Sequence, residues 1–354
     1  MFGKRSSGGS SKKKKFRTRF GQIEIANSSG FGKLVRGFAI SPLLQEMMVY
    51  VGQMESYGNG VEILEKLAGV EVSVTQLYRV TDTYGALLEV QIAQEEESAK
   101  EEQVDEGEMV YAQMDGGMIL TDDDWREVKV GRLFRENDCQ ISTSEKRNGS
   151  IRESHYSAYL GNYQEFMNRF GRVISPYGHL GERLVFLSDG ALWIKNWISE
   201  HYPQAVQILD FYHVKEHLTE FAELVYPDAA KRRKWLEVQA DRLLEGDFQA
   251  VIQCIRSFAL PLPKTRGKQQ NLINYLLDNE YRMRYKEYLE NGLFIGSGAI
   301  EAAHRTVVQC RLKRSGQRWS EIGAQNMLNL RVAHMSSQWN KVVDLIKVSD
   351  AQAA

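Results

Sequence analysis

Two short apolar runs in the middle of the chain each stop at an aspartate, and this pattern constrains the fold more than any other. Residues 184–187 (Leu-Val-Phe-Leu) precede Ser188-Asp189-Gly190, and residues 206–209 (Val-Gln-Ile-Leu) precede Asp210. Apolar runs of about four to eight residues bounded by turn signals are typical of buried strands. A helical pattern lies between the two runs, so the segment predicts an α/β sheet. Functional sites in open α/β sheets lie at the carboxyl ends of strands, which is where both aspartates fall.

The segments on either side extend this pattern. Further strands are predicted over residues 109–114, where Asp115-Gly116-Gly117 ends the run, over residues 125–134 and over residues 156–160, and a further helix over residues 163–172. Nearly all of residues 211–288 has a helical pattern, and another helix begins after Gly296-Ser297-Gly298. We therefore expect a sheet with a helical insertion before its last helix.

Upstream of residue 105 the apolar residues follow a helical period. One helix is predicted over residues 42–57, a second ends at Gly69, and a third opens at Ser73, where Gln76 completes a capping-box pattern. Helix, glycine-containing turn and helix is the sequence form of a helix-turn-helix. Its second helix would present Thr75, Gln76 and Arg79 to DNA. An ordinary helical hairpin fits the same residues, so both interpretations stay open.

The charge of the chain is balanced in total but uneven along its length. There are 45 Lys and Arg against 46 Asp and Glu, a net charge of −1. Residues 1–19 are basic and rich in Ser and Gly, which predicts a flexible arm that binds phosphate or only solubilises the chain. Residues 89–108 are strongly acidic and indicate a domain boundary near residue 105. Residues 305–318 and the run Lys231-Arg232-Arg233-Lys234 are cationic and could follow a phosphate backbone.

The composition excludes several classes of protein. Six Trp, 16 Tyr and 14 Phe exclude a chain that is disordered throughout. Six Pro and three widely separated Cys exclude a collagen-like or disulfide-built scaffold. No apolar run approaches the roughly 18 residues of a membrane helix, and the basic N-terminus lacks the apolar segment of a secretory signal. We expect a cytoplasmic protein with reduced thiols and no membrane partner.

Four carboxylates stand where a metal site of such a sheet would form. Asp115, Asp189 and Asp210 follow apolar strands, and Glu301 lies in the first turn of the late helix. Each has an ordinary structural explanation as well, such as a hairpin turn at Asp115, a helix N-cap at Asp189 or an ion pair between Glu301 and Arg305. Carboxylates are ligands that magnesium prefers, and a pair of such ions stabilises both the attacking and the leaving oxygen of phosphoryl transfer. Together with the basic stretches, they favour metal-dependent phosphoryl chemistry.

Either Asp189 or Asp210 could be the second metal ligand, after Asp115, because both follow apolar strands. Asp189 is followed by Gly190-Ala191, which would leave room beside the backbone for a metal and a phosphate. Asp210 is followed by Phe211-Tyr212, which would crowd a substrate. We therefore predict that Asp189 binds the metal and that Asp210 orients His213 or caps the helix behind the site.

At these residues the chain resembles bacterial insertion-sequence transposases of the Kra type (ISKra family). The matching blocks, in the same order, are residues 110–117 with 125–131, residues 188–194, residues 209–213, residues 295–301 and residues 311–320. The resemblance covers roughly residues 16–335. Many family members carry an N-terminal zinc element built from cysteine pairs, whereas the first 138 residues here contain no cysteine. This difference concerns the recognition of DNA ends more than catalysis.

The resemblance implies an RNase H-like fold and a DDE transposase. Such an enzyme cleaves transposon ends and joins the free 3′-hydroxyl to target DNA with two Mg²⁺ or Mn²⁺ ions. By position, Asp115, Asp189 and Glu301 match the catalytic, metal-binding triad. Asp210 and His213 match an Asp/Cys-x-x-His element of related transposase groups, in which a helical block is inserted between the fifth strand and the Glu-bearing helix, and we assign both residues a role behind the metal ligands. DNA is the implied partner, bound by at least a dimer in the cytoplasm at the nucleoid.

Two further groups of residues have predicted roles, and the sequence leaves two other functions open. Arg311, Lys313, Arg314 and Arg318 are predicted to contact the DNA backbone, because no acidic residue accompanies them in sequence. A zinc site of Asp210, His213 and His217 would lack a fourth ligand, which favours a structural role for the histidines. A catalytically silent DNA-binding relative of a transposase is the main alternative function. A glycoside hydrolase ranks far lower, because it has no use for the basic cluster.

The expected organisation has five parts. They are a basic flexible arm (residues 1–20), a helical DNA-binding region with the helix-turn-helix (21–105), the first part of the RNase H-like core (106–217), the helical insertion (218–292) and the Glu301 helix with the C-terminal helices (293–346).

Overall fold

A computed structural model describes residues 14–18, 21–25, 40–96, 100–140 and 149–353. The chain divides into two compact units. One, here called the sheet unit, comprises residues 96–118 and 127–305, and the other, the helical unit, comprises residues 1–95, 119–126 and 306–354. Residues 1–13 and 19–20 of the predicted basic arm lie outside the described residues. Lys14–Thr18 (β1) instead pairs antiparallel with Gly21–Ile25 (β2), so that part of the expected arm has regular structure.

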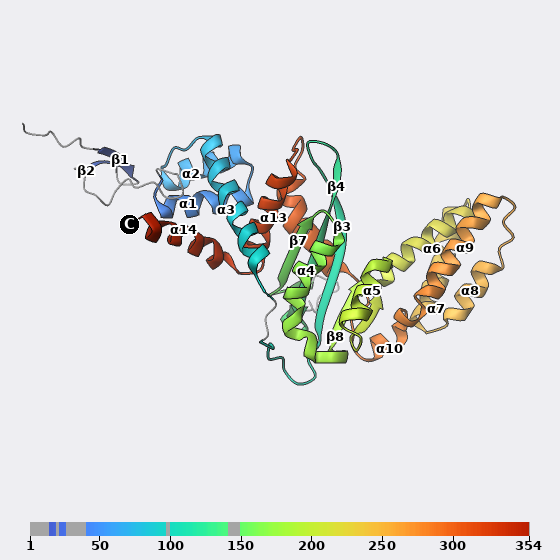
Figure 1. Ribbon diagram of the computed structural model, residues 1–354. Helices are drawn as coiled ribbons and strands as arrows, with labels where there is room; N and C mark the ends of the chain where they lie inside the picture. The colour runs from blue at the N-terminus through green and yellow to red at the C-terminus, as the bar shows by residue number, and fades with distance from the viewer. Residues whose placement is uncertain (1–13, 19–20, 26–39, 97–99, 141–148, 354) are drawn as a thin grey trace, which may run out of the picture. The chain divides into compact units, whose positions relative to one another are not determined.

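The sheet has five strands in the order β7-β4-β3-β8-β9, and the predicted mixed α/β class is confirmed (Figure 1). Its strands are β3 (Val110–Leu120), β4 (Trp125–Arg135), β7 (His155–Leu160), β8 (Leu184–Ser188) and β9 (Val206–Leu209). β4 and β7 are antiparallel, whereas β3, β8 and β9 are parallel. A small hairpin, β5 (Cys139–Gln140) with β6 (Ser150–Ile151), lies apart from this sheet.

One predicted strand end was wrong. β3 does not stop at Asp115 but continues through Gly116 and Gly117 to Leu120. The turn comes later, where the Thr121 hydroxyl donates to the Asp124 carbonyl at 2.6 Å. The two glycines have a packing reason instead, because a Cβ at Gly116 would meet the Glu127 carboxylate at 2.3 Å and one at Gly117 would meet the His304 ring at 2.9 Å.

Alternate residues of the central strands face two separate cores, as the two-residue period of a strand requires. Val110, Ala112 and Met114 pack with α4 (Tyr163–Ile174) and α5 (Leu192–His201), and the 3₁₀ segment Ser175–Arg183 extends this layer. Tyr111, Val185 and Leu187 face the other way, into a core shared with the helices that follow β9. Both faces of the sheet are therefore covered by helices, which is typical of sheets with parallel strands.

The predicted helical block follows β9 within the sheet unit (Figure 1). Its helices are α6 (Phe211–Val225), α7 (Ala229–Leu244), α8 (Phe248–Arg256), α9 (Pro263–Asp278) and α10 (Tyr285–Glu290), with a 3₁₀ turn at Glu280–Arg282. Next come α11 (Gly298–Ala303), the π-helical turn His304–Gln309 and α12 (Cys310–Leu312). The order of elements matches the predicted helical insertion before the helix that carries Glu301.

The helical unit contains α1 (Pro42–Met54), α2 (Tyr57–Ala68), α3 (Val74–Gln94), α13 (Glu321–Met335) and α14 (Trp339–Ala353). Gly69 ends α2 at φ 64°, and Ser73 with Gln76 forms the predicted capping box of α3. Leu330 and Ile346 join the apolar core of α1–α3, which explains why residues 306–354 belong to this unit rather than completing the sheet core as expected. None of the helices in the described part of the chain is long and apolar enough to cross a membrane.

Candidate active site

The three parallel strands bring the predicted aspartates to one edge of the sheet. In register, Met114 is paired with Ser188, and Ser188 with Leu209. The residues that follow these pairs are Asp115, Asp189 and Asp210. Parallel strands place their carboxyl ends at the same edge, so the pairing of the strands creates the cluster that the sequence pattern predicted.

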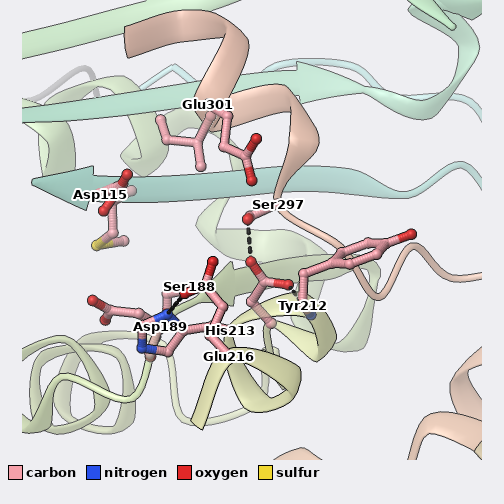
Figure 2. Close-up of a pocket in the computed structure, with 11 residues that line it drawn as sticks. Asp115, Ser188, Asp189, Tyr212, His213, Glu216, Ser297 and Glu301 are labelled. Carbon is pink, nitrogen blue, oxygen red and sulfur yellow. Dashed lines mark hydrogen bonds and ion pairs between the residues drawn. The ribbon is translucent and has the colours of Figure 1, made fainter. Parts of the chain in front are cut away.

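These carboxylates line a pocket of about 330 Å³ in the sheet unit. Five of its eleven lining residues are acidic, namely Asp115, Asp189, Asp210, Glu216 and Glu301. None of the eleven is Lys or Arg. Figure 2 shows Asp115 on its strand and Glu301 on its helix along one side of the pocket, with Asp189 and His213 on the other. The structure thus brings the three predicted triad residues to one cavity from three distant parts of the sequence.

Asp210 caps the helix behind the pocket, as predicted. Its carboxylate accepts the backbone N–H of Tyr212 at 2.8 Å, and it also accepts a hydrogen bond from the hydroxyl of Ser297. The aspartate is only 5% exposed, and Tyr212 packs its ring against Gly296. Asp210 therefore links the start of α6 to the Gly-Ser-Gly turn before Glu301, and its carboxylate is already occupied by protein donors.

Residues of the helical insertion contact the loop that carries Asp189 and stabilise its position. Arg282, which is fully buried, donates to the Ser188 hydroxyl at 2.8 Å and to the Asp189 carbonyl at 3.2 Å. A Cβ at Gly190 would meet the ring of Tyr275 at 2.2 Å. The expectation that Gly190 leaves room for a metal and a phosphate is therefore corrected, because the ring of Tyr275 fills that space. The carboxylate of Asp189 accepts the Ala191 N–H at 3.0 Å and borders the pocket.

His304 is a site residue that the sequence pattern did not reveal. Its Nε2 lies 3.6 Å from the Asp115 carboxylate, and the residue is only 7% exposed. Nε2 has no hydrogen-bond partner within the described residues. The available signal was its position three residues after Glu301, which places both side chains on one helical face. The sequence analysis did not identify His304, because its contact with Asp115 joins residues that are far apart in the chain.

The environment of Asp115 disfavours its negative charge. Burial raises the pKa of the Asp115 carboxyl above its ordinary value, and the nearby charge of Asp189 acts in the same direction. The attraction of His304 and the hydrogen bond from Gly116 only partly oppose this rise. A carboxylate whose negative charge is disfavoured by burial and by a second carboxylate is a candidate for a functional site.

Replacing Asp115 by Asn should therefore raise the melting temperature of the metal-free protein at neutral pH. An aspartate with a raised folded-state pKa favours folding only while it is protonated, so its ionised form costs stability once the pH exceeds its ordinary value of about 4. The advantage of Asp115→Asn should shrink as the pH falls toward that value. Calorimetry from acidic to neutral pH, in chelator, measures this difference. A variant that is less stable than the wild type at neutral pH would contradict the assigned environment.

The donors of this pocket suit a hard divalent cation. The acidic lining residues carry carboxylate oxygens, which magnesium and manganese prefer, and no lysine or arginine in the lining neutralises them. The carboxylate of Asp210 differs from the others because protein donors occupy both of its oxygens. Within the described residues, no group of three or more His, Cys, Asp or Glu is arranged to hold a metal ion. The carboxylates therefore share a cavity and a suitable chemistry without forming a closed coordination shell.

The predicted DNA-contacting residues fall into two groups within the helical unit. Thr75, Gln76 and Arg79 on α3 are exposed, and so are Lys313 and Arg318. Their proposed DNA contacts stay predictions. Arg314 is half-buried and forms a 2.7 Å ion pair with Glu55, so this cation does have an acidic partner.

Arg311 requires a correction, because it is fully buried. Its guanidinium donates to the Gly52 carbonyl at 2.9 Å and lies over the rings of Tyr57 and Trp319. Burial lowers the pKa of Arg311 to about 10. The side chain stabilises the helical unit from inside and does not reach a DNA backbone.

Two histidines of α6, His213 and His217, lie near the pocket, and in the described part of the chain they form no zinc site with Asp210. His213 and His217 contact each other edge to face, with 4.8 Å between ring centroids. Nδ1 of His213 lies 3.4 Å from the Glu216 carboxylate, and His217 packs on Tyr275. The structural role favoured for both is consistent with these contacts.

A family model described as "Uncharacterised protein family (UPF0236)" matches residues 39–347 of the chain. No curated protein matches it. The matched region includes the helices from α1 to α13 and the first part of α14, the whole five-stranded sheet and every residue of the candidate active site.

Proposed function

Because the chain belongs to the uncharacterised protein family UPF0236, its function has to be argued from the site, and we propose that it is a DDE transposase. In this proposal the enzyme cleaves DNA strands at transposon ends and joins the free 3′-hydroxyl to target DNA. The single observation that carries the proposal is the acidic pocket, in which Asp115, Asp189 and Glu301 converge from distant segments without a lysine or arginine in the lining.

The topology supports the same proposal. The mixed sheet β7-β4-β3-β8-β9, with an antiparallel edge pair and three parallel strands, is compatible with the RNase H-like fold that the resemblance implies. In the proposed assignment, Asp115 lies on the central strand, Asp189 follows its parallel neighbour, and Glu301 comes from the helix after the insertion. The resemblance to Kra-type transposases assigns the triad to these same three positions.

In this proposal, the residues in and around the pocket have separate roles. Asp115, Asp189 and Glu301 would hold divalent cations, and the chemistry that Mg²⁺ or Mn²⁺ supplies when bound is neutralisation of the phosphodiester and activation of the attacking oxygen. Asp210 would keep the Glu301 turn in place through Ser297. Arg282 would hold the backbone of the Asp189 loop, so that this carboxylate faces the pocket. His304 would position Asp115 through the contact between its Nε2 and that carboxylate, 3.6 Å apart.

Cleavage should depend on a divalent metal. A supercoiled plasmid that carries the gene with its natural flanking DNA should be nicked in Mg²⁺ or Mn²⁺ and left intact in excess chelator, as followed by gel electrophoresis. The same protein with Glu301→Gln, purified in parallel, is the control for contaminating nucleases and should not nick. Undiminished nicking in chelator would rule out the metal mechanism. Binding of the flanking DNA without any nicking would favour the catalytically silent DNA-binding relative instead.

A further inference from the structure

The far end of the helical insertion carries a concentration of positive charge that the active site does not use. Two loops meet there, because the ring of Phe258 contacts both Phe221 and Tyr226, with 5.7 Å between centroids in each case. These contacts join the turn between α6 and α7 to the turn between α8 and α9. Figure 1 shows these four helices side by side as one bundle. The active-site end is the opposite one, where Tyr275 of α9 meets Gly190.

We call this end the cationic tip and define it as residues 231–234, Arg256, Lys264, Arg266 and Lys268. All of these side chains are exposed except Arg232, which is half-buried. The segments 226–234 and 256–268 contain eight Lys and Arg and a single acid, Asp228, in a chain whose net charge is −1. Asp228 caps α7 through the Lys231 N–H at 2.8 Å. The tip is therefore strongly positive, although the chain as a whole is nearly neutral.

Local stability does not explain these charges. The N-terminal turns of α7 and α9 favour acidic side chains because of the helix dipole, yet neither helix has an acid in its first turn. Arg256, in the last turn of α8, is the one tip cation that the dipole favours. Among the described residues, Arg233 alone of the tip cations forms an ion pair, with Glu237 at 4.0 Å. Exposed, unpaired cations gathered on one surface are the electrostatic footprint of a polyanion-binding site.

We propose that the cationic tip binds the phosphate backbone of duplex DNA, outside the segment that enters the active site. The choice of DNA as the polyanion rests on the proposed function. The exposed and unpaired lysines suit a contact that is independent of sequence, because phosphate contacts position a protein on DNA without reading its bases. The tip would anchor DNA to the same helices, α6 and α9, that border the pocket and support the Asp189 loop.

The test compares two triple variants of the full chain. Lys231→Gln, Lys264→Gln and Lys268→Gln together remove three charges from the tip, and Gln keeps a helix propensity close to that of Lys. The control removes three exposed cations that have acidic partners elsewhere: Arg152→Gln, Lys286→Gln and Lys347→Gln. Binding to a labelled duplex of arbitrary sequence is measured by fluorescence anisotropy over a range of salt concentrations. Excess chelator is present throughout, so that cleavage cannot affect the result.

The tip variant should bind more weakly, and the slope of log affinity against log salt should become shallower by up to about 2.7, at about 0.9 for each lost phosphate contact. The control should keep the wild-type slope. An unchanged slope in the tip variant, or an equal change in the control, would overturn the proposal. So would a tip variant that keeps its DNA affinity but loses binding to phosphatidylserine vesicles. Because binding is measured without metal, a protein that fails to cleave DNA but shows the expected slopes contradicts only the proposed function.

Discussion

The Asp189→Asn variant is expected to keep its fold and its DNA binding while losing strand cleavage by more than about 100-fold. Loss of a residue that only supports a metal ligand typically costs about 10–100-fold in activity, so loss of a ligand itself should cost more. Asn keeps the shape of the side chain and can still accept the Ala191 N–H, but it lacks the charge that a cation requires. Plasmid nicking in Mg²⁺ measures the loss, and circular dichroism and anisotropy check the fold and DNA binding.

Asp210→Asn is the matched comparison, since it makes the same chemical change at the end of the adjacent strand. Asn caps a helix about as well as Asp, so the bond from the Tyr212 N–H should survive. The contact with Ser297 would weaken, and cleavage should fall by no more than about 10–100-fold, as for a residue that supports a ligand. If Asp189→Asn cleaves normally while a folded Asp210→Asn protein does not, the two aspartates have the opposite roles.

Replacing Arg282 by Met is expected to destabilise the sheet unit by about 3 kcal/mol. The guanidinium makes three hydrogen bonds, to Ser188, Asp189 and Asn279, and each is worth roughly 1 kcal/mol net. Met fills much of the same volume, so the loss reports mainly on these bonds and on the acceptors left without a donor. Amide hydrogen exchange of β8 and β9 measures the free energy of opening where the effect should appear.

Arg284→Met is the control for this substitution, two residues further along. Arg284 is exposed, and its ion pair with Glu287 at 3.1 Å joins two exposed side chains. Pairs of this kind contribute at most about 1 kcal/mol. Equal protection of β8 and β9 in the two variants would mean that Arg282 does not support the Asp189 loop. If only Arg282→Met reduces the protection of β8 and β9, then the helical insertion stabilises the strands that carry Asp189 and Asp210 into the pocket.

The periodicity of the sequence by itself determined the types and order of the elements. The apolar runs before Asp189 and Asp210 are β8 and β9, the long helical pattern is α6–α10, and Ser73 caps α3. These features depend on neighbouring residues, because strand and helix periods and capping bonds are local. The aspartates at strand ends could be predicted as a cluster for the same reason, since parallel pairing follows once the elements are known.

Only the tertiary structure decided which side chains share the pocket and which cations face water. His304 meets Asp115, and Arg282 meets Ser188, across 189 and 94 residues respectively, and no local pattern encodes such contacts. Arg311 and Lys313 look alike in sequence, yet the first is buried against two aromatic rings and the second is exposed. The strand through Asp115 also continues past Gly116 and Gly117. At these positions the missing Cβ leaves space that the side chains of Glu127 and His304 fill. Burial and long-range packing depend on the whole fold, whereas sequence periodicity describes only one element at a time.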